Sequence, residues 1–258
     1  MIFKDMHGFR FAAGRWPLDP ERPTLIFIHG SGGDHTLWQG QVDALVDVAN
    51  TLALDLPGHG ASSSSGGASI PERAEEVADL LEGLQAPRPI PCGLSIGGAI
   101  GLQLLLDRSA LLAGGVLVGT GARLRVLPEI IAMIETDYAG FVDMLGQFGA
   151  SEKTDPERLR SVRQAAAACG PAVTAGDFRA CDRFDVMDQL DRIDKPVLVV
   201  SAEDDRLTPP KYSDYLEKHI RTSQRVHIRD AGHLVPIEKP AALNQALTAF
   251  IASLSDQM

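Results

Sequence analysis

The sequence predicts an α/β protein in which helices flank a mostly parallel sheet. Short apolar runs such as TLIFIH (24–29) and PVLVVS (196–201) alternate with amphipathic stretches, which is the pattern of successive βα units. Turn-forming glycines follow several of these runs. Residues 122–191 lack this alternation and show helical patterns only, which indicates a helical insertion between two strands of the sheet.

The first part of the chain carries the early strands and helices of this sheet. Residues 1–11 and 12–18 predict an opening hairpin that turns around Gly8. Strands are expected over residues 24–29, 51–56, 89–94 and 114–118, and helices over 37–48, 71–84 and 95–106. Pro71 stands where a first-turn proline favours a helix start. The serine run 62–65 predicts a polar loop.

The second part contains the insertion and the end of the sheet. Within the insertion, helices are expected over residues 128–134, 141–148, 156–168 and 176–184. The sheet then resumes with a strand at 196–201, a helix at 209–219, a strand at 225–228 and a closing helix at 236–254. We therefore expect a core made of residues 1–121 and 192–258, with residues 122–191 as a helical cap.

Composition and charge indicate which classes of molecule the protein is not expected to bind, and where it is expected to occur. The chain has 258 residues, with 45% hydrophobic and 22% charged, which suits one large globular domain or one domain with a sizeable insertion. Its formal charge is 24 − 34 = −10, so it would repel nucleic acid and anionic lipid surfaces. We find no basic and apolar leader and no apolar stretch of about 18 residues, and expect a cytoplasmic protein without a membrane span.

Neither metal nor organic cofactor is expected. The three cysteines, Cys92, Cys169 and Cys181, have no spacing typical of a disulfide framework or a zinc site. Elsewhere, no group of His, Cys and Asp shows the spacing of metal ligands. The chemistry is therefore expected to come from side chains and backbone groups alone.

The strongest chemical signal is the G-x-S-x-G pattern GLSIG at 93–97, which lies between a predicted strand and a helix of small residues. A strand that turns sharply into a helix leaves the serine strained at the tip, and bulk two residues away on either side would clash. The helix N-terminus also stabilises negative charge there. We predict Ser95 as a nucleophile; the alternative is a glycine-rich turn that contains a serine by chance.

A second glycine-rich segment, HGSGG at 29–33, directly follows the strand 24–29. A tight loop in this place can direct a backbone N–H at a developing oxyanion. We predict the amides of Ser31 and Ile96 as an oxyanion hole, with Gly32 as the next candidate donor. The alternative is an ordinary connection. His29 is expected to be structural.

The partners of the serine are expected near the end of the chain. His233 lies between the last predicted strand and the last helix, at the sheet edge where open α/β folds bind ligands, and is predicted as general base. A buried carboxylate must orient its ring. The segment AEDD at 202–205 follows the preceding strand, and Asp205 is the predicted acid, with Asp204 as the reserve.

Together these motifs resemble the α/β-hydrolase superfamily, in its branch of esterases, lactonases and C–C bond hydrolases. The resemblance rests on HGSGG (29–33), DLPGHGAS (55–62), GLSIGG (93–98), AEDD (202–205) and DAGHLVPIEKP (230–240), in the family order Ser…Asp…His. It implies the α/β-hydrolase fold, with a mostly parallel eight-stranded sheet and an inserted cap. The family acid commonly stands three residues after a glycine; Ala202 replaces that glycine here but still points to Asp205.

The resemblance and the residues imply acyl transfer through a covalent acyl-enzyme. We expect a carboxylesterase that cleaves small to medium esters. Alternatives on the same fold are a lactonase of the enol-lactone type, a C–C bond hydrolase, a perhydrolase and a catalytically weak ligand-binding protein. Relatives with an aspartate nucleophile, the haloalkane dehalogenases and epoxide hydrolases, are disfavoured because a serine stands at position 95. The oligomeric state stays open.

The substrate pocket is expected to draw on the cap. Residues at near-helical spacings that could line it, with packing onto the core as the alternative, are Met133, Phe141, Met144, Leu145 and Phe148. Gly32 and Trp38 are further candidates for substrate contact, although a tryptophan in this position packs more often than it binds. Arg123 and Arg125 could bind a substrate carboxylate, against the commoner fate of arginine on the surface.

Overall fold

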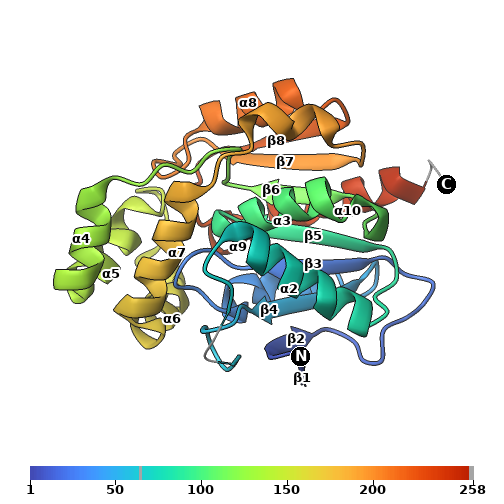
Figure 1. Cartoon of the computed structure of the whole chain (residues 1–258), viewed down its shortest axis with the longest axis horizontal. Coiled ribbons are helices and arrows are strands. Elements are labelled where there is room, and N and C mark those ends of the chain that lie inside the picture. Colours follow the sequence, from blue (N-terminus) through green and yellow to red (C-terminus); the bar gives the residue numbers. More distant parts are fainter. Residues whose placement is uncertain (64–65, 256–258) are drawn as a thin grey trace.

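A computed structural model describes residues 1–63 and 66–255, which form a single eight-stranded sheet with helices on both faces (Figure 1). The strand order is β1-β2-β4-β3-β5-β6-β7-β8. The strands are β1 (Ile2–Met6), β2 (Phe9–Ala13), β3 (Thr24–Ile28), β4 (Asn50–Asp55), β5 (Pro89–Leu94), β6 (Gly115–Val118), β7 (Val197–Ala202) and β8 (Ser223–Ile228). The predicted α/β class is confirmed.

The sheet is mostly parallel, as predicted. Strands β4, β3, β5, β6, β7 and β8 run parallel to their neighbours in this part of the sheet, while β1 and β2 join as an antiparallel hairpin, and β2 pairs antiparallel with β4. The hairpin turns at His7 and Gly8, which both have positive φ, of 50° and 83°. Such a turn needs residues that tolerate the left-handed region, and glycine does so without a steric penalty.

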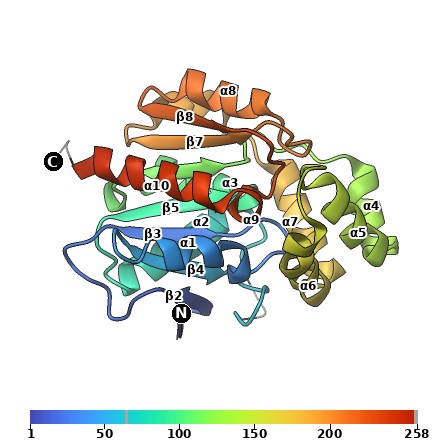
Figure 2. The same ribbon diagram turned by 180° about the vertical axis from the view of Figure 1, so that it is seen from behind.

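Helices cover both faces of the sheet because its strands are apolar on both sides. Helices α2 (Ile70–Gly83), α3 (Ile96–Asp107) and α8 (Pro210–His219) pack on one face, and α1 (Gln39–Ala44) and α10 (Pro240–Ser255) on the other (Figures 1 and 2). Alternate residues of β3 point into the two layers: Ile26 and Ile28 join one buried cluster, and Leu25 and Phe27 the other.

A group of helices between β6 and β7, which we call the helical insert, lies at one end of the sheet (Figure 1). Its helices are α4 (Pro128–Thr136), α5 (Tyr138–Phe148), α6 (Arg160–Cys169) and α7 (Pro171–Arg183), with short 3-10 turns η3 (Pro156–Leu159) and η4 (Met187–Arg192). The insert has its own small buried cluster, which contains Ile134, Phe141 and Ala175. Helix α7 is the member of the insert nearest the sheet in both views (Figures 1 and 2).

Several predicted helices differ from the structure. In the insert, the helix expected over residues 156–168 is divided into η3 and α6, and the one expected over 176–184 begins earlier, as α7. The helix expected over residues 37–48 is a 3-10 turn, η1 (His35–Trp38), followed by the short α1, because Asp34 caps the chain earlier by accepting the Thr36 N–H. The closing helix expected over residues 236–254 is divided into α9 (Val235–Glu238) and α10. The division falls at Lys239, since the residue before a proline is disfavoured in the helical region, and Pro240 follows it.

Part of the predicted polar loop at 62–65 lies outside the described residues, because these do not include Ser64 and Ser65. In the described part of the chain, every helix is too short or too polar to cross a membrane.

Candidate active site

Ser95 stands at the sharp turn between β5 and α3, with φ of 57° and ψ of −117°. A positive φ is strained for a residue with a side chain and persists only where its surroundings fix it. Two hydrogen bonds do so here. The Ser95 amide donates to the Val118 carbonyl at 3.1 Å, and Thr120 Oγ1 donates to the Ser95 carbonyl at 2.8 Å. The neighbouring strand and loop therefore hold the serine backbone in its strained form.

The glycines on either side of Ser95 have a steric reason. A Cβ atom at Gly93 would lie 2.0 Å from the Gly97 carbonyl oxygen, and one at Gly97 would lie 2.3 Å from the Ile28 carbonyl oxygen. These distances are far shorter than any van der Waals contact between such atoms. Side chains at these positions would separate α3 from β5 and β3, so the tight turn requires glycine at both positions.

His233 and Asp205 form a buried hydrogen-bonded pair. The His233 Nδ1 lies 2.9 Å from Asp205 Oδ2, and the two residues are 5% and 3% exposed. Three further donors fix the carboxylate: the amides of Leu207 and Thr208 donate to Oδ1 at 2.9 and 2.8 Å, and Thr208 Oγ1 donates to Oδ2 at 2.8 Å. Loop and side-chain donors thus orient Asp205, and Asp205 in turn orients the ring.

The reserve acid, Asp204, faces elsewhere. Its Oδ2 accepts a hydrogen bond from Ser151 Oγ at 2.5 Å, and its amide donates to the Ala231 carbonyl at 2.8 Å. Of the two candidate aspartates, Asp205 is therefore the one that bonds to His233.

Burial and pairing act in opposite directions on the two groups. Burial raises the pKa of Asp205, but the charge and hydrogen bond of His233 and the Thr208 donors lower it more, and the pKa lies below its ordinary value. Burial lowers the pKa of His233, yet the charge and hydrogen bond of Asp205 raise it more, and the pKa lies above 6.5. Asp205 is therefore ionised at neutral pH and stabilises a protonated His233.

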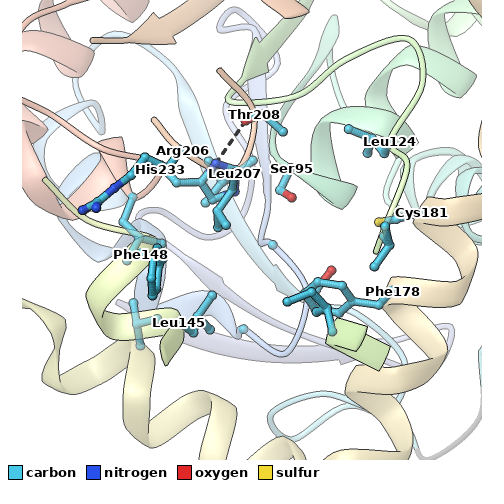
Figure 3. A pocket seen from close by; sticks show the side chains of 18 of the residues that line it. Ser95, Leu124, Leu145, Phe148, Phe178, Cys181, Arg206, Leu207, Thr208 and His233 are labelled. Carbon is cyan, nitrogen blue, oxygen red and sulfur yellow. Dashed lines mark hydrogen bonds between the residues drawn. The ribbon is translucent and has the colours of Figure 1, made fainter. Parts of the chain in front are cut away.

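Ser95 and His233 both line one cavity of about 300 Å³ under the helical insert. Figure 3 shows both side chains at this cavity, together with the contact between Thr208 Oγ1 and the His233 ring, 3.1 Å from Nδ1. Both ring contacts use Nδ1, which leaves Nε2 as the nitrogen that could take up a proton. No direct hydrogen bond joins the Ser95 hydroxyl to His233 within the described residues.

The cavity wall opposite these polar groups is apolar and comes largely from the insert. The side chains that form it are Leu124, Val126, Leu127, Ile130, Phe141, Met144, Leu145, Phe148, Val162 and Phe178. The candidates Phe141, Met144 and Phe148 are thus among the lining residues. Phe141 is held by an edge-on contact with Phe178, with ring centroids 5.5 Å apart.

Three of the other candidates lie outside this lining. Trp38 is fully buried and stacks on Phe27 at 5.0 Å between ring centroids, so it packs in the core. Met133 is partly buried and packs against the buried cluster of the insert. The Gly32 amide is already occupied, because it donates to Asp177 Oδ2 at 3.0 Å.

The two arginines at the start of the insert have different surroundings. Arg125 lines the cavity, and its Nη1 donates to the Asp182 carbonyl at 2.9 Å. Arg123 lies outside the lining, with Nη1 at 3.7 Å from Asp185 Oδ2. A third arginine, Arg206, lines the cavity and lies over the Phe148 ring at 5.4 Å.

The amides in the loop after β3 differ in their partners. Gly33 donates its amide to the Gly30 carbonyl at 3.0 Å, and Gly32 is engaged as described. Ser31 lines the cavity, and its amide has no hydrogen-bond acceptor among the described residues. Ile96 is the first residue of α3, a position whose N–H has no acceptor inside the helix. Both amides thus lack an acceptor among the described residues of their own segments.

His29 is structural in this arrangement, as expected. Its Nε2 accepts the Leu56 amide at 3.1 Å, and its Nδ1 lies 2.7 Å from the Gly30 carbonyl oxygen. Burial, assisted by the charge of His59, lowers the pKa of His29 to about 4, so the ring is neutral.

Sequence reasoning missed two residues that support the site, Thr208 and Asp177, and placed a third, Glu238, in a motif without assigning its contacts. Thr208 bonds both members of the His–Asp pair. Glu238 accepts the amides on both sides of His233, from Gly232 at 2.9 Å and Leu234 at 2.8 Å. Asp177 holds the loop after β3. Glu238 lies within the motif DAGHLVPIEKP (230–240), as the last residue of α9, whereas Asp177 lies in the insert, far from every motif.

A metal site was sought in the described residues, 1–63 and 66–255. Within them, no three or more His, Cys, Asp or Glu side chains gather in a way that could hold a metal ion.

The strand order and the position of the serine elbow at the middle of the sheet are those of an α/β hydrolase. The chain belongs to the alpha/beta hydrolase family, whose profile matches residues 25–246. The fold is accordingly the α/β-hydrolase fold with a helical insert region, as the sequence resemblance implied.

Several characterised proteins are similar to this chain over most of their length. A 3-oxoadipate enol-lactonase of Acinetobacter baylyi is 26% identical over 239 residues, which are 90% of each chain. A pimeloyl-[acyl-carrier protein] methyl ester esterase of Nitrosomonas europaea is 25% identical over 82% of this chain and 88% of its own. The solved structure of a thermophilic esterase is 32% identical, with a TM-score of 0.83 over 98% of this chain and 97% of its own.

Proposed function

We propose that this protein is a serine hydrolase that cleaves carboxylic esters of small to medium size through an acyl-enzyme. The observation that carries the proposal is the buried His233–Asp205 pair, which shares one cavity with the strained Ser95. A nucleophile, a base and an orienting carboxylate at one site are the requirements for acyl transfer at neutral pH.

In the proposed reaction, Ser95 Oγ attacks the ester carbonyl while His233 Nε2 takes its proton. Asp205 stabilises the resulting imidazolium through Nδ1. His233 then returns the proton to the leaving alcohol, which departs from the acyl-enzyme. A water molecule that gives its proton to the same nitrogen attacks the acyl group, and release of the acid restores Ser95.

The oxyanion of each tetrahedral intermediate would be bound by the amides of Ser31 and Ile96. Both donors are backbone groups held by the fold, so they need no reorganisation when charge develops on the substrate oxygen. The Ile96 amide also lies at the N-terminus of α3, where the helix dipole favours negative charge.

We further propose that residues 122–191 act as a cap that supplies the acyl pocket, with residues 1–121 and 192–258 as the catalytic core. A cavity of about 300 Å³ is at the small end of the range for ligand sites, which favours short and medium acyl groups. Its apolar wall would bind an alkyl or aryl chain. The esterase relatives support this reading of the substrate class.

A lactone substrate is the second candidate. The enol-lactonase of Acinetobacter baylyi is similar over 90% of this chain, and ring opening of a lactone uses the same acyl transfer. Arg125 and Arg206 at the cavity wall could bind a carboxylate on such a substrate. A panel of alkyl esters, simple lactones and lactones with an acid substituent would separate the two candidates by their kcat/KM values.

The test of the proposed function is hydrolysis of p-nitrophenyl acetate and butyrate. We expect activity in the wild type and loss of essentially all of it in Ser95→Ala. The matched control is Ser109→Ala, which removes a hydroxyl just beyond the far end of α3 and should leave the rate unchanged. Equal rates in the wild type and in Ser95→Ala would overturn the proposal.

A further inference from the structure

A carboxylate of the helical insert is buried against the core beside the active site. Asp177 belongs to α7 and has no exposed surface. It accepts three hydrogen bonds from three separate segments: from the Gly32 amide at 3.0 Å, from His59 Nε2 at 2.9 Å and from Arg73 Nη1 at 2.6 Å. One side chain thus joins the insert to the loop after β3, to the loop after β4 and to α2.

The charges in this cluster are balanced well enough to keep Asp177 ionised. Burial raises the pKa of Asp177, but the bonds and charges of His59 and Arg73 lower it to about 2. Burial lowers the pKa of His59, and the bond and charge of Asp177 raise it to about 10. The carboxylate is therefore a strong acceptor, and a buried carboxylate gives its donors shorter and stronger hydrogen bonds than a neutral group would.

The two oxygens of Asp177 have different partners. Oδ1 accepts from Arg73 only, whereas Oδ2 accepts from both Gly32 and His59. Gly32 is pressed against α7: its φ is +67°, and a Cβ atom there would lie 3.1 Å from Thr174 Oγ1. Its amide is therefore turned toward the insert, while the preceding residue, Ser31, lines the cavity.

We propose that Asp177 is a positioning residue for the oxyanion hole, which it sets by holding the Gly32 amide and thereby fixing the loop that presents the Ser31 amide to the substrate. The inference rests on the proposed function. It also means that the loop takes its catalytic shape only when α7 is seated on the core, so that substrate contacts in the insert and oxyanion binding in the core are linked through one side chain.

Three variants separate this role from a merely structural one. Asp177→Ala removes the acceptor of the Gly32 amide. Asp177→Asn keeps one carbonyl oxygen that can still accept it. Arg73→Gln is the matched control, because it breaks the Oδ1 contact of the same carboxylate and leaves the Oδ2 contacts to Gly32 and His59 in place. All assays are run at a temperature at which thermal unfolding shows each variant to be folded.

We expect kcat for p-nitrophenyl butyrate to fall at least about tenfold in Asp177→Ala with KM within about threefold, since removing a whole oxyanion donor costs about 10²–10³ in other enzymes. Asp177→Asn should fall between this variant and the wild type, and Arg73→Gln should stay within about threefold. Inhibition by a trifluoromethyl ketone, which forms a tetrahedral oxyanion on the serine, should weaken in proportion to kcat/KM.

The inference is overturned if Asp177→Ala keeps kcat within twofold, or if Arg73→Gln loses as much as Asp177→Ala while folded. If Asp177→Ala does not fold, Asp177→Asn must lose more than Arg73→Gln, and equal losses overturn the inference. A failure of the proposed function looks different, because Ser95→Ala would then be as active as the wild type.

Discussion

Asp205 Oδ2 lies 2.9 Å from His233 Nδ1, although 28 residues separate the two in the chain. The contact joins the loop after β7 to the loop after β8, and these parallel neighbours carry their following loops to the same edge of the sheet. The register of the last two strands therefore sets the geometry of the acid and the base.

The first prediction concerns this acid. Asp205→Asn should lower kcat by about 10⁴, the loss seen when the orienting aspartate of a serine triad becomes an amide that favours the wrong tautomer. The measurement is steady-state hydrolysis of p-nitrophenyl butyrate by purified protein.

The neighbouring aspartate is the control for that substitution. Asp204→Asn changes the same charge one residue away, but its side chain bonds Ser151 rather than the histidine. Its kcat should stay within about threefold of the wild type. A larger loss in Asp204→Asn than in Asp205→Asn would show that the acid is wrongly assigned.

The second prediction is the pH profile of kcat/KM. His233 must be neutral to act as a base, and its pKa is raised above 6.5 because the effect of Asp205 exceeds that of burial. Activity should therefore rise with pH through an apparent pKa above 6.5. In Asp205→Asn the contributions of Asp205 to the His233 pKa disappear and only the smaller one from Glu238 remains, so the midpoint of the residual activity should move to lower pH. A midpoint that is the same in both proteins would contradict the coupling.

The third prediction tests the acyl pocket. Phe141 is 1% exposed and lines the cavity, so Phe141→Ala should make room for a longer chain. The kcat/KM ratio of p-nitrophenyl octanoate to butyrate should rise about tenfold, because the space left by the ring would newly bury about two methylenes at about 0.8 kcal/mol each. Met133→Ala is the control, since Met133 is partly buried and packs against the same cluster but lies outside the lining. An equal change in both variants would mean that Phe141 does not limit chain length.

The residues that could be predicted from the sequence are those at positions where the local backbone allows only one kind of side chain. Gly93 and Gly97 flank Ser95 because any Cβ atom there would collide with the backbone. This steric requirement produces the short pattern G-x-S-x-G, which is visible in the sequence. The loops that follow successive parallel strands were also predictable, because their common edge follows from the topology.

The residues that sequence could not locate act through contacts between distant segments. Asp177 meets Gly32 across 145 residues, and neither its identity nor its helix distinguishes it from surface aspartates. For Trp38 the sequence left two fates open, substrate contact and packing, and the side chain turns into the core against Phe27. The contacts of Asp177 and Trp38 depend on how α7 and η1 pack on the rest of the protein, which short sequence patterns do not reveal.

The central claim is that the Ser95 hydroxyl is the nucleophile, and covalent capture tests it most directly. The protein is incubated with a fluorophosphonate and examined by intact-mass and peptide mass spectrometry. The account predicts one phosphonyl group per chain, on Ser95, with hydrolysis lost in step with labelling and no label on Ser95→Ala. A protein that hydrolyses esters while Ser95 stays unlabelled, or that carries the label on another residue, would contradict it.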